Sequence, residues 1–340
     1  MDIKNIKKVF HLSHIDLDGY SCQLITNRIF RNIKFFNSNY GEEISQKLSH
    51  IVDEVSKDDM VLITDLNLSL DDAKYIDTKS KEIGFKLLLL DHHKTGEDCA
   101  KAYDWYRLDV SRCATKITYD FFSLYHDISD MDEYVASVNA YDIWLQDQKD
   151  RFEVGKVLAR YVMSAKELNR VMFSDESFSY ITYLLKEGSK EIGKDKAQIV
   201  LDDILHKIKK DFFIKDENDT LENLVSEYVV ELLIKNKNNM TIYIDGYKGI
   251  LTYNIGNTSI IGNSFLKRNS DYDFFFDLNN RKNISMRADN NCDVSEIANK
   301  YFGGGGHANA SGGKFQEFKD SFLYHDIKEQ VESFIESKKV

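Results

Sequence analysis

The sequence MVLITDLNLSLDDAKYIDTKSKEIGFKLLLLDHH, residues 60–93, contains the pattern that decides the fold. Residues 60–64 and 86–90 are short apolar runs of strand length, and residues 69–83 between them show helical spacing that stops at Gly84. A helix of this length is the usual right-handed crossover between two parallel strands. We therefore expect a strand–helix–strand unit in a parallel sheet that is buried on both faces.

The same alternation continues toward the N-terminus. Residues 8–13 and 33–37 are apolar runs that predict strands, and residues 19–31 and 42–56 show helical spacing. Strands that alternate with helices in this rhythm are typical of an α/β domain with a parallel sheet. We expect this domain to occupy residues 1–150.

Residues 151–237 have a different character, because helical spacing dominates there. From residue 238 the chain alternates again, beginning with a hairpin around Gly246 to Gly249. The elements predicted after it are, in chain order, a helix (259–268), two strands (271–278 and 283–288), a second helix (294–302) and a terminal helix. The sequence thus predicts an α/β fold in which a helical connector (151–237) joins the parallel-sheet domain to a smaller α/β domain (238–340).

The composition is that of a globular protein. A length of 340 residues suggests two domains, and 42% hydrophobic residues supply more than one core. The formal net charge of −11 leaves no global positive field that would attract long nucleic acid or an anionic membrane. A phosphate substrate remains compatible with this charge, because bound divalent cations reverse its sign locally.

The cysteines and the N-terminal residues indicate the compartment. The chain has four cysteines, at positions Cys22, Cys99, Cys113 and Cys292. They form no CxxC pair, which is typical of reduced thiols in a cytoplasmic protein. Charged residues precede any apolar run of signal-peptide length, and no stretch of 18 apolar residues follows. We expect a soluble, cytoplasmic protein without a membrane partner.

Imidazoles and carboxylates follow the ends of three predicted strands. The first strand is followed by His14, Asp16 and Asp18, the third by Asp65, and the fourth by Asp91, His92 and His93, while Asp142 ends the helix that closes the domain. The carboxyl ends of parallel strands lie at one edge of the sheet, where ligands bind. These side chains are therefore expected to share one site.

Such a site needs cations. Crowded carboxylates repel one another, and burial raises their pKa values unless cations neutralise them. Histidine with several aspartates and no nearby cysteine suits Mn²⁺ first, followed by Mg²⁺, Fe²⁺ or Zn²⁺. About six donors exceed the need of one ion and fit two ions roughly 3.5–4 Å apart. The alternative is that Asp18 or Asp65 taken alone is a helix N-cap and that a histidine pair lies in a surface loop; the shared geometry favours the metal site.

A second candidate site lies in YFGGGGHANASGG, residues 301–313. The backbone N–H groups of Gly303–Gly306 are unobstructed by side chains, which suits a phosphate or another anion. The alternative is a helix C-cap followed by a flexible loop. Arg287, on a predicted strand, either faces solvent or clamps a phosphate with two hydrogen bonds.

Together these motifs resemble the DHH phosphoesterase family, named after the Asp-His-His triplet that stands here at residues 91–93. The other motifs match in order: HIDLDG at 14–19, TDLN at 64–67 and AYDIW at 140–144, with GGGGHANASGG at 303–313 similar to the signature of the first type of DHH-associated C-terminal domain. Asn309 and Ser311 are mild departures from that signature.

The resemblance implies a hydrolase with two divalent ions, usually Mn²⁺, and an active site in the cleft between a DHH domain (1–150) and the C-terminal domain (238–340). One ion would be held by His14, Asp16 and Asp65, and the other by Asp18, Asp65, His92 and Asp142. Asp65 would bridge the two ions, His93 would face the substrate phosphate, and Asp91 would orient a histidine. The implied nucleotide-binding residues are Arg287, Gly304, Gly305, Gly306 and His307.

The resemblance leaves several substrates open. Exonucleolytic hydrolysis of short RNA or DNA oligomers to 5′-mononucleotides comes first, as in nano-RNases, because the negative charge argues against a track for long single-stranded DNA. A phosphodiesterase acting on linear or cyclic dinucleotides and a phosphatase acting on 3′-phosphoadenosine 5′-phosphate are the alternatives. A nucleotide sensor without turnover is the non-enzymatic alternative. The connector either sets the spacing of the domains or forms a homodimer face.

Overall fold

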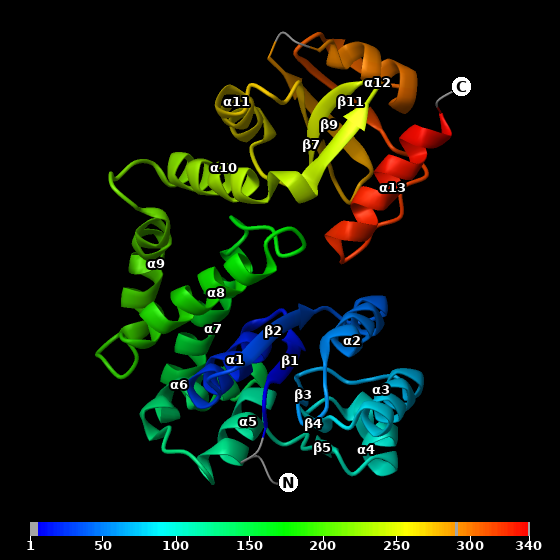
Figure 1. The fold of residues 1–340 in the computed structure, drawn as a ribbon. Coiled ribbons are helices and arrows are strands. Elements are labelled where there is room, and N and C mark those ends of the chain that lie inside the picture. The colour runs from blue at the N-terminus through cyan, green and yellow to red at the C-terminus, as the bar shows by residue number, and fades with distance from the viewer. Residues whose placement is uncertain (1–5, 290–291, 339–340) are drawn as a thin grey trace. The chain divides into compact units, whose positions relative to one another are not determined.

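The computed structural model of the chain describes residues 6–289 and 292–338. The chain divides into two compact units, which are discontinuous in sequence. The first unit comprises Met1–Ala165 and Phe178–Ile208, and the second comprises Lys166–Ser177 and Lys209–Val340. Figure 1 shows the order of their elements along the chain.

The first unit contains a five-stranded sheet in which every pair of neighbours is parallel, as predicted. Its order is β2-β1-β3-β4-β5, and the strands are β1 (Val9–His14), β2 (Ile33–Ser38), β3 (Met60–Thr64), β4 (Lys86–Asp91) and β5 (Tyr106–Leu108). All five residues of β3, the central strand between β1 and β4, are buried. The short strand β5 is absent from the sequence prediction.

Helices connect the strands and extend the unit beyond the sheet. They are α1 (Leu17–Ile29), α2 (Glu42–Glu54), α3 (Leu70–Ile83), α4 (Glu97–Ala102), α5 (Ala114–Ser123) and α6 (Asp132–Asp142), with short 3₁₀ turns at Lys94–Gly96 and Ser129–Met131. Capping residues set several of the boundaries. Ser69 accepts a hydrogen bond from the backbone of Asp72 at the start of α3, and Gly84 ends that helix in the left-handed conformation.

The middle of the chain is helical, as its spacing predicts, and its helices are divided between the two units. They are α7 (Lys149–Ser164), α8 (Ser174–Ser189), α9 (Ala197–Phe213) and α10 (Leu221–Met240). In the first unit α7 packs closely on α6 at Gly155. A Cβ at this position would lie 2.3 Å from the backbone oxygen of Ser137, so the close packing requires glycine. The hydroxyl of Tyr161 on α7 donates to the backbone oxygen of Leu201 on α9 at 2.7 Å.

The second unit contains a six-stranded mixed sheet of order β10-β11-β9-β8-β7-β6. Its elements are β6 (Thr241–Ile244), β7 (Tyr247–Tyr253), α11 (Thr258–Arg268), β8 (Phe274–Leu278), β9 (Asn283–Ala288), α12 (Val294–Phe302), β10 (Gly305–His307), β11 (Ala310–Lys314) and α13 (Tyr324–Ser337). Strands β7 and β8 are parallel and the other neighbouring pairs are antiparallel. The predicted hairpin is present as β6–β7, but it turns at Asp245 and Gly246, both with positive φ, and Gly249 lies within β7.

Each unit has its own apolar core. In the second unit the strands β7 to β9 and the helices α12 and α13 bury a cluster that includes Phe274, Phe276, Phe302 and Phe318. In the first unit the strands β1, β3 and β4 bury their apolar residues against α2 and α3. Within the described residues, no helix has the length and apolar character that crossing a bilayer requires.

Candidate metal centre

Histidine and aspartate side chains gather at the carboxyl edge of the first unit's sheet. The ends of β1, β3 and β4, the start of α1 and the end of α6 supply them: His14, Asp16, Asp18, Asp65, Asp91, His92, His93 and Asp142. Ion-pair distances of 2.7–4.0 Å link these residues to one another. The structure therefore brings together all the residues of the first unit that the sequence assigns to a site.

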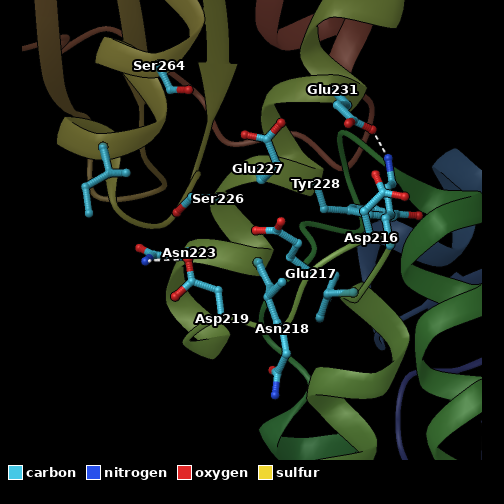
Figure 2. A pocket seen from close by; sticks show the side chains of 14 residues that line it. Asp216, Glu217, Asn218, Asp219, Asn223, Ser226, Glu227, Tyr228, Glu231 and Ser264 are labelled. Atoms are coloured by element: carbon cyan, nitrogen blue, oxygen red, sulfur yellow. Dashed lines mark hydrogen bonds and ion pairs between the residues drawn. The ribbon is translucent and has the colours of Figure 1, made fainter.

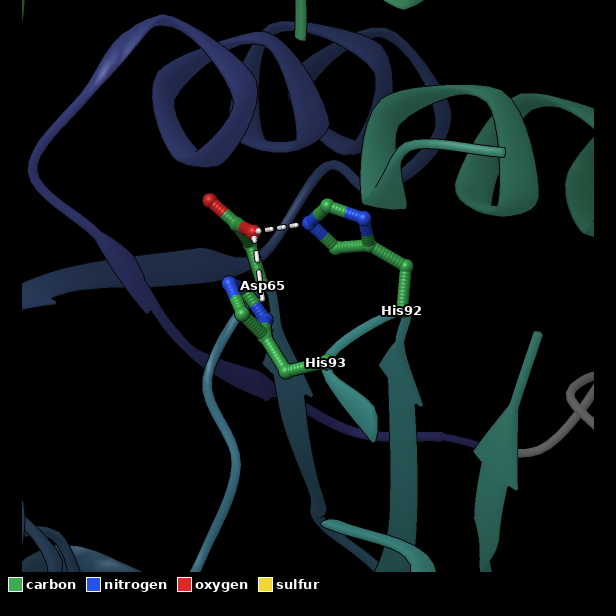
Figure 3. Close-up of side chains that lie close together, drawn as sticks. All are labelled: Asp65, His92 and His93. Atoms are coloured by element: carbon green, nitrogen blue, oxygen red, sulfur yellow. Dashed lines mark ion pairs between the residues drawn. The ribbon is translucent and has the colours of Figure 1, made fainter. Parts of the chain in front are cut away.

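Asp65 lies in the middle of this group. Its Oδ2 is 3.6 Å from Nδ1 of His14, and its Oδ1 is 3.3 Å from Nε2 of His92 and 4.0 Å from Nδ1 of His93. Figure 3 shows the contacts of Asp65 with the two neighbouring histidines. Asp65 follows β3 directly with φ 56°, a left-handed conformation that aspartate tolerates better than most residues. Because β1 and β4 flank β3, the buried carboxylate reaches imidazoles from both strands.

One group of donors forms around His14. Its Nδ1 is 3.0 Å from Oδ2 of Asp16, and one ligand atom each from His14, Asp16 and Asp65 lie within 4.8 Å of one another. This group coincides with the set that the family resemblance implies for one ion. Asp16 also accepts a hydrogen bond from the backbone N–H of Gly19 at 3.0 Å, so it caps α1 at the same time.

A second group forms around His92. Its Nε2 lies 3.6 Å from Oδ2 of Asp18, 3.6 Å from Oδ2 of Asp142 and 3.3 Å from Oδ1 of Asp65. Three carboxylates from three separate segments thus face one imidazole nitrogen. These four residues coincide with the set that the resemblance implies for the other ion.

Cys113 also lies near this second group, with its ligand atom within 4.8 Å of those of Asp18 and Asp142. Burial and the charges of those two carboxylates raise the pKa of its thiol well above the usual value. The sulfur accepts a hydrogen bond from the backbone of Lys116 and caps α5. Cys113 is therefore a helix cap beside the second group, whereas the sequence interpretation assumed that no cysteine lies near the site.

The donor set fits divalent cations. His14 Nδ1, Asp65 Oδ2 and Asp142 Oδ2 are buried and make no hydrogen bond among the described residues, although they lie 3.0–3.6 Å from oppositely charged or ionisable neighbours. Burial and the charges of Asp18 and Asp16 raise the pKa of Asp65 well above its usual range. Burial and the charge of Asp18 raise the pKa of Asp142 to about 8, against the opposing effect of His92. Unpaired buried polar atoms cost stability, and bound cations would both pair these atoms and neutralise their charge.

The N-cap alternative for the acidic residues holds in part. Asp18 is buried and accepts the backbone N–H groups of Ala114 and Thr115, both at 2.7 Å, so it caps α5 rather than its own helix. Asp65 caps no helix, because Ser69 caps α3. The N-terminus of α5 therefore fixes the carboxylate of Asp18 beside His92.

A hydrogen-bonded chain orients the second histidine of the triplet. Asp91 is fully buried and its Oδ1 lies 2.7 Å from Nδ1 of His93, while its Oδ2 accepts from the hydroxyl of Tyr106 at 2.6 Å. The other ring nitrogen of His93, Nε2, lies 2.8 Å from the hydroxyl of Tyr40. The histidine that Asp91 orients is therefore His93.

Tyr40 is a residue of this site that sequence reasoning missed. It lies between β2 and α2, and its ring centroid is 4.6 Å from that of His14 and 5.5 Å from that of His93. The signal that could have found it is its place just after the carboxyl end of β2, because the other strand ends supply the remaining residues of the site.

In the second unit, the C-cap part of the alternative interpretation of the glycine run is confirmed, but a strand follows the cap instead of a flexible loop. Gly303 ends α12 in the left-handed conformation, and Gly305–His307 form β10, which pairs with β11. A Cβ at Gly304 would lie 1.9 Å from the backbone oxygen of Gly312, and one at Gly306 would lie 2.6 Å from that of Ala310. The backbone of Gly304 and Gly306 lies so close to β11 that neither position has room for a Cβ, which is why both are glycine.

Arg287 and His307 differ in how they are held. The guanidinium of Arg287 donates to the backbone oxygen of Met286 at 2.7 Å and to the hydroxyl of Ser259 at 2.8 Å. His307 and Gly305 are exposed, and a Cβ at Gly305 would meet no atom within 4 Å. All of these residues belong to the second unit, whereas the metal-ligand candidates belong to the first.

A separate cavity of about 650 Å³ lies within the second unit. Its lining comes from the loop between α9 and α10 and from helices α10 and α11, and its carboxylates include Asp216, Glu217 and Asp219 (Figure 2). Lys215 pairs with Glu231 at its wall. Among the described residues, none of those that line it belongs to the metal-ligand candidates.

Comparison with known proteins gives relatives that match most of the chain. The sequence matches no family model. The 3′,5′-cyclic-nucleotide phosphodiesterase of Helicobacter pylori (strain ATCC 700392 / 26695) is 40% identical over 96% of this chain and 98% of its own length. Oligoribonuclease NrnB of Bacillus subtilis (strain 168) is 25% identical over 89% of this chain and 72% of its own length.

Among solved structures, an uncharacterized protein from Helicobacter pylori G27 is similar along almost the whole chain. The TM-score is 0.90 and the sequence identity 40%, over 97% of this chain and 99% of the other. The fold described above is therefore also the fold of a protein solved by crystallography.

Proposed function

Because the chain belongs to the DHH superfamily, in the family of the Helicobacter pylori 3′,5′-cyclic-nucleotide phosphodiesterase, we propose that it hydrolyses phosphodiester bonds of nucleotides with two divalent metal ions. The observation that carries this proposal is the cluster of buried potential metal-ligand atoms on His14, Asp65 and Asp142, which make no hydrogen bond among the described residues and lie at the carboxyl edge of the first sheet. Such atoms destabilise a fold unless a ligand pairs them.

The proposed ligand sets follow the two groups around His14 and His92. One ion is held by His14, Asp16 and Asp65, and the other by Asp18, Asp65, His92 and Asp142. Asp65 belongs to both sets and bridges them. Imidazole with carboxylate oxygens suits Mn²⁺ best, and Mg²⁺ is the alternative.

When bound, such ions acidify a water molecule and stabilise negative charge on phosphoryl oxygens. The chain's own residues position the substrate. Oδ1 of Asp91 accepts a hydrogen bond from Nδ1 of His93, and this hydrogen bond fixes the ring with Nε2 beside the hydroxyl of Tyr40. We assign to His93, and to the hydroxyl of Tyr40 beside it, contacts with the substrate phosphate. Arg287, Gly304, Gly305, Gly306 and His307 are the candidate nucleotide-binding residues of the second unit.

The relatives narrow the choice of substrate. A 3′,5′-cyclic nucleotide and a short oligonucleotide contain the same 3′,5′-phosphodiester, and breaking its P–O3′ bond releases a nucleoside 5′-monophosphate in both cases. The sequence alone favours short oligonucleotides, but the relative with 40% identity is named for the cyclic substrate and the oligoribonuclease is 25% identical. We therefore place 3′,5′-cyclic mononucleotides first and dinucleotides or slightly longer oligonucleotides second.

A substrate panel at fixed Mn²⁺ tests this proposal. It contains 3′,5′-cyclic AMP, a dinucleotide, a five-mer, a 24-mer, cyclic di-AMP and 3′-phosphoadenosine 5′-phosphate. We expect fastest release of 5′-monophosphate from the cyclic mononucleotide, with the dinucleotide next. Fastest cleavage of the 24-mer, or a 3′-monophosphate product, would contradict the substrate assignment.

Two matched variants separate the site from the rest of the chain. Asp65→Asn removes one charge from the shared ligand and is expected to abolish turnover of every substrate in the panel. Asp98→Asn makes the same chemical change at an exposed position on α4 and is expected to leave turnover unchanged. Full activity of Asp65→Asn would show that the hydrolase site lies elsewhere.

A further inference from the structure

Trp144 occupies a backbone position that normally belongs to glycine. Helix α6 ends with the backbone N–H of Leu145 donating to the oxygen of Ala140 at 2.7 Å and that of Trp144 donating to the oxygen of Tyr141 at 3.3 Å. These two hydrogen bonds form a Schellman motif, in which the residue after the C-cap is left-handed. That residue is Trp144, with φ 61°.

A tryptophan at this position is costly in two ways. A left-handed conformation is strained for a bulky side chain, because the Cβ approaches the backbone. In addition, 63% of Trp144 is exposed to solvent, although it is the largest apolar residue type. Backbone strain of this kind is retained mainly at functional sites. The strained and exposed position of the indole therefore indicates that it binds a ligand.

The indole is supported from one side. Its centroid lies 5.0 Å from that of Phe152 on α7, with the two rings nearly perpendicular at 85°, and Phe152 itself is buried. Tyr141 lies further away, at 6.4 Å. Phe152 therefore holds the ring in place while most of the indole surface stays accessible.

Trp144 also lies close to the metal-ligand candidates along the chain. It follows Asp142 by two residues, so their Cα atoms are at most about 7.6 Å apart. The Schellman hydrogen bonds fix this short segment. The left-handed turn thus places a rigid aromatic surface at a constant position relative to a carboxylate that faces His92.

We propose that Trp144 is the surface on which the nucleobase of the substrate stacks. This inference rests on the proposed function and adds a second recognition element to it: the metal centre takes the phosphate and the indole takes the base. Every nucleobase has a flat π-face, so stacking on tryptophan contributes affinity with little dependence on base identity. Trp144 then contributes to the distinction between nucleotides and phosphodiesters that lack a base.

Fluorescence tests the stacking directly. The sequence contains two tryptophans, and Trp105→Phe leaves Trp144 as the only indole. Trp105 donates through Nε1 to Asp77 and packs beside Tyr103 and Tyr106. Because Tyr106 donates to Asp91, the Trp105→Phe protein is used only after its turnover is shown to equal that of the wild type. With Mg²⁺ present, AMP is expected to quench the emission of Trp144 saturably, whereas ribose 5-phosphate and inorganic phosphate leave it unchanged.

Kinetics and thermal unfolding of Trp144→Gly provide the second test. Glycine relieves the left-handed strain, so the melting temperature is expected to stay the same or rise, while KM for 3′,5′-cyclic AMP rises about 10-fold with a smaller change in kcat. Ribose 3′,5′-cyclic phosphate, which lacks a base, is expected to be hydrolysed equally by both proteins. Trp144→Phe is expected to recover part of the affinity.

Tyr125→Gly is the matched control, since it removes an aromatic side chain that is 51% exposed in the turn after α5. It should leave KM unchanged. A saturable response to ribose 5-phosphate, or a fall in the melting temperature of Trp144→Gly with an unchanged KM, would overturn the stacking role. Absence of quenching by AMP in an active enzyme would do the same and leave the proposed function standing. Quenching by AMP in a protein that hydrolyses no substrate would support stacking and overturn the proposed function.

Discussion

At the scale of single residues, Asp65 illustrates how far sequence position determines a site. Its place after a buried parallel strand was sufficient to predict that it would share one edge with residues from the neighbouring strands. The structure adds that its left-handed backbone directs both carboxylate oxygens to imidazoles on either side. That conformation has no signature in a single sequence, because aspartate adopts it only occasionally.

Tyr40 shows the opposite case, since no motif marks it. Its hydroxyl lies 2.8 Å from Nε2 of His93 and its ring packs against His14. Tyr40→Phe removes the hydroxyl and keeps the ring. We expect kcat to fall about 3- to 10-fold, the effect of one lost hydrogen bond, with the melting temperature unchanged. An unchanged kcat, measured with saturating substrate and Mn²⁺, would show that the hydroxyl has no role in turnover.

Asp277 provides a test of stability against pH in the second unit. Burial raises its pKa from the ordinary value of 3.8 to about 7, although Thr252 and Ile255 donate hydrogen bonds to its Oδ1. The unfolded chain therefore loses this proton near pH 4, whereas the folded protein keeps it up to about pH 7. Consequently, this group makes the protein less stable as the pH rises from about 4 to about 7.

The variant Asp277→Asn cannot ionise, and its Oδ1 can accept the same two hydrogen bonds. We expect it to melt at a higher temperature than the wild type at about pH 8 and at nearly the same temperature at about pH 4. Thermal unfolding followed by circular dichroism at both pH values measures this difference. Equal melting temperatures at about pH 8 would mean that the buried carboxyl ionises without cost.

At the scale of elements, periodicity predicted those that are long enough to show it. The strands β1 to β4 and the helices between them appear where the sequence places them, with ends shifted by a few residues. The strands β5 and β10 have three residues each, and a run of that length carries no period. Tertiary pairing alone defines such strands, as the register of β10 with β11 shows.

The hairpin β10–β11 can be distinguished experimentally from the flexible loop that was the alternative interpretation of the glycine run. Gly304→Ala would place a Cβ 1.9 Å from the backbone oxygen of Gly312, whereas Gly305→Ala would meet no atom within 4 Å. We expect the first variant to lower the free energy of unfolding by about 1–3 kcal/mol and the second to change it little. Equal effects of the two substitutions, measured by denaturant unfolding, would indicate a flexible loop instead.

At the scale of the whole molecule, the alternation of strands and helices was sufficient to predict two α/β regions and a helical stretch between them. It could not assign each helix to a unit. The helical spacing of residues 151–237 reports one apolar face per helix and does not identify its partner. Contacts such as that of Tyr161 with Leu201 decide that assignment, and they exist only in the folded chain.

The charge of the whole molecule is consistent with cations at the site. Burying Asp65 and facing it with Asp16 and Asp18 adds electrostatic cost to a chain whose formal charge is already −11. This electrostatic cost is confined to the carboxyl edge of the first unit's sheet. Bound divalent ions would offset it, and they would stabilise the folded state in proportion to their affinity.

The central claim is that the first unit holds two divalent ions through a shared Asp65. Its most direct test is the number of Mn²⁺ ions bound per chain, measured by equilibrium dialysis and elemental analysis, for the wild type, Asp65→Asn and Asp98→Asn. The account predicts two ions per chain for the wild type and Asp98→Asn and fewer than two for Asp65→Asn. One ion or none in the wild type, or two in Asp65→Asn, would contradict it.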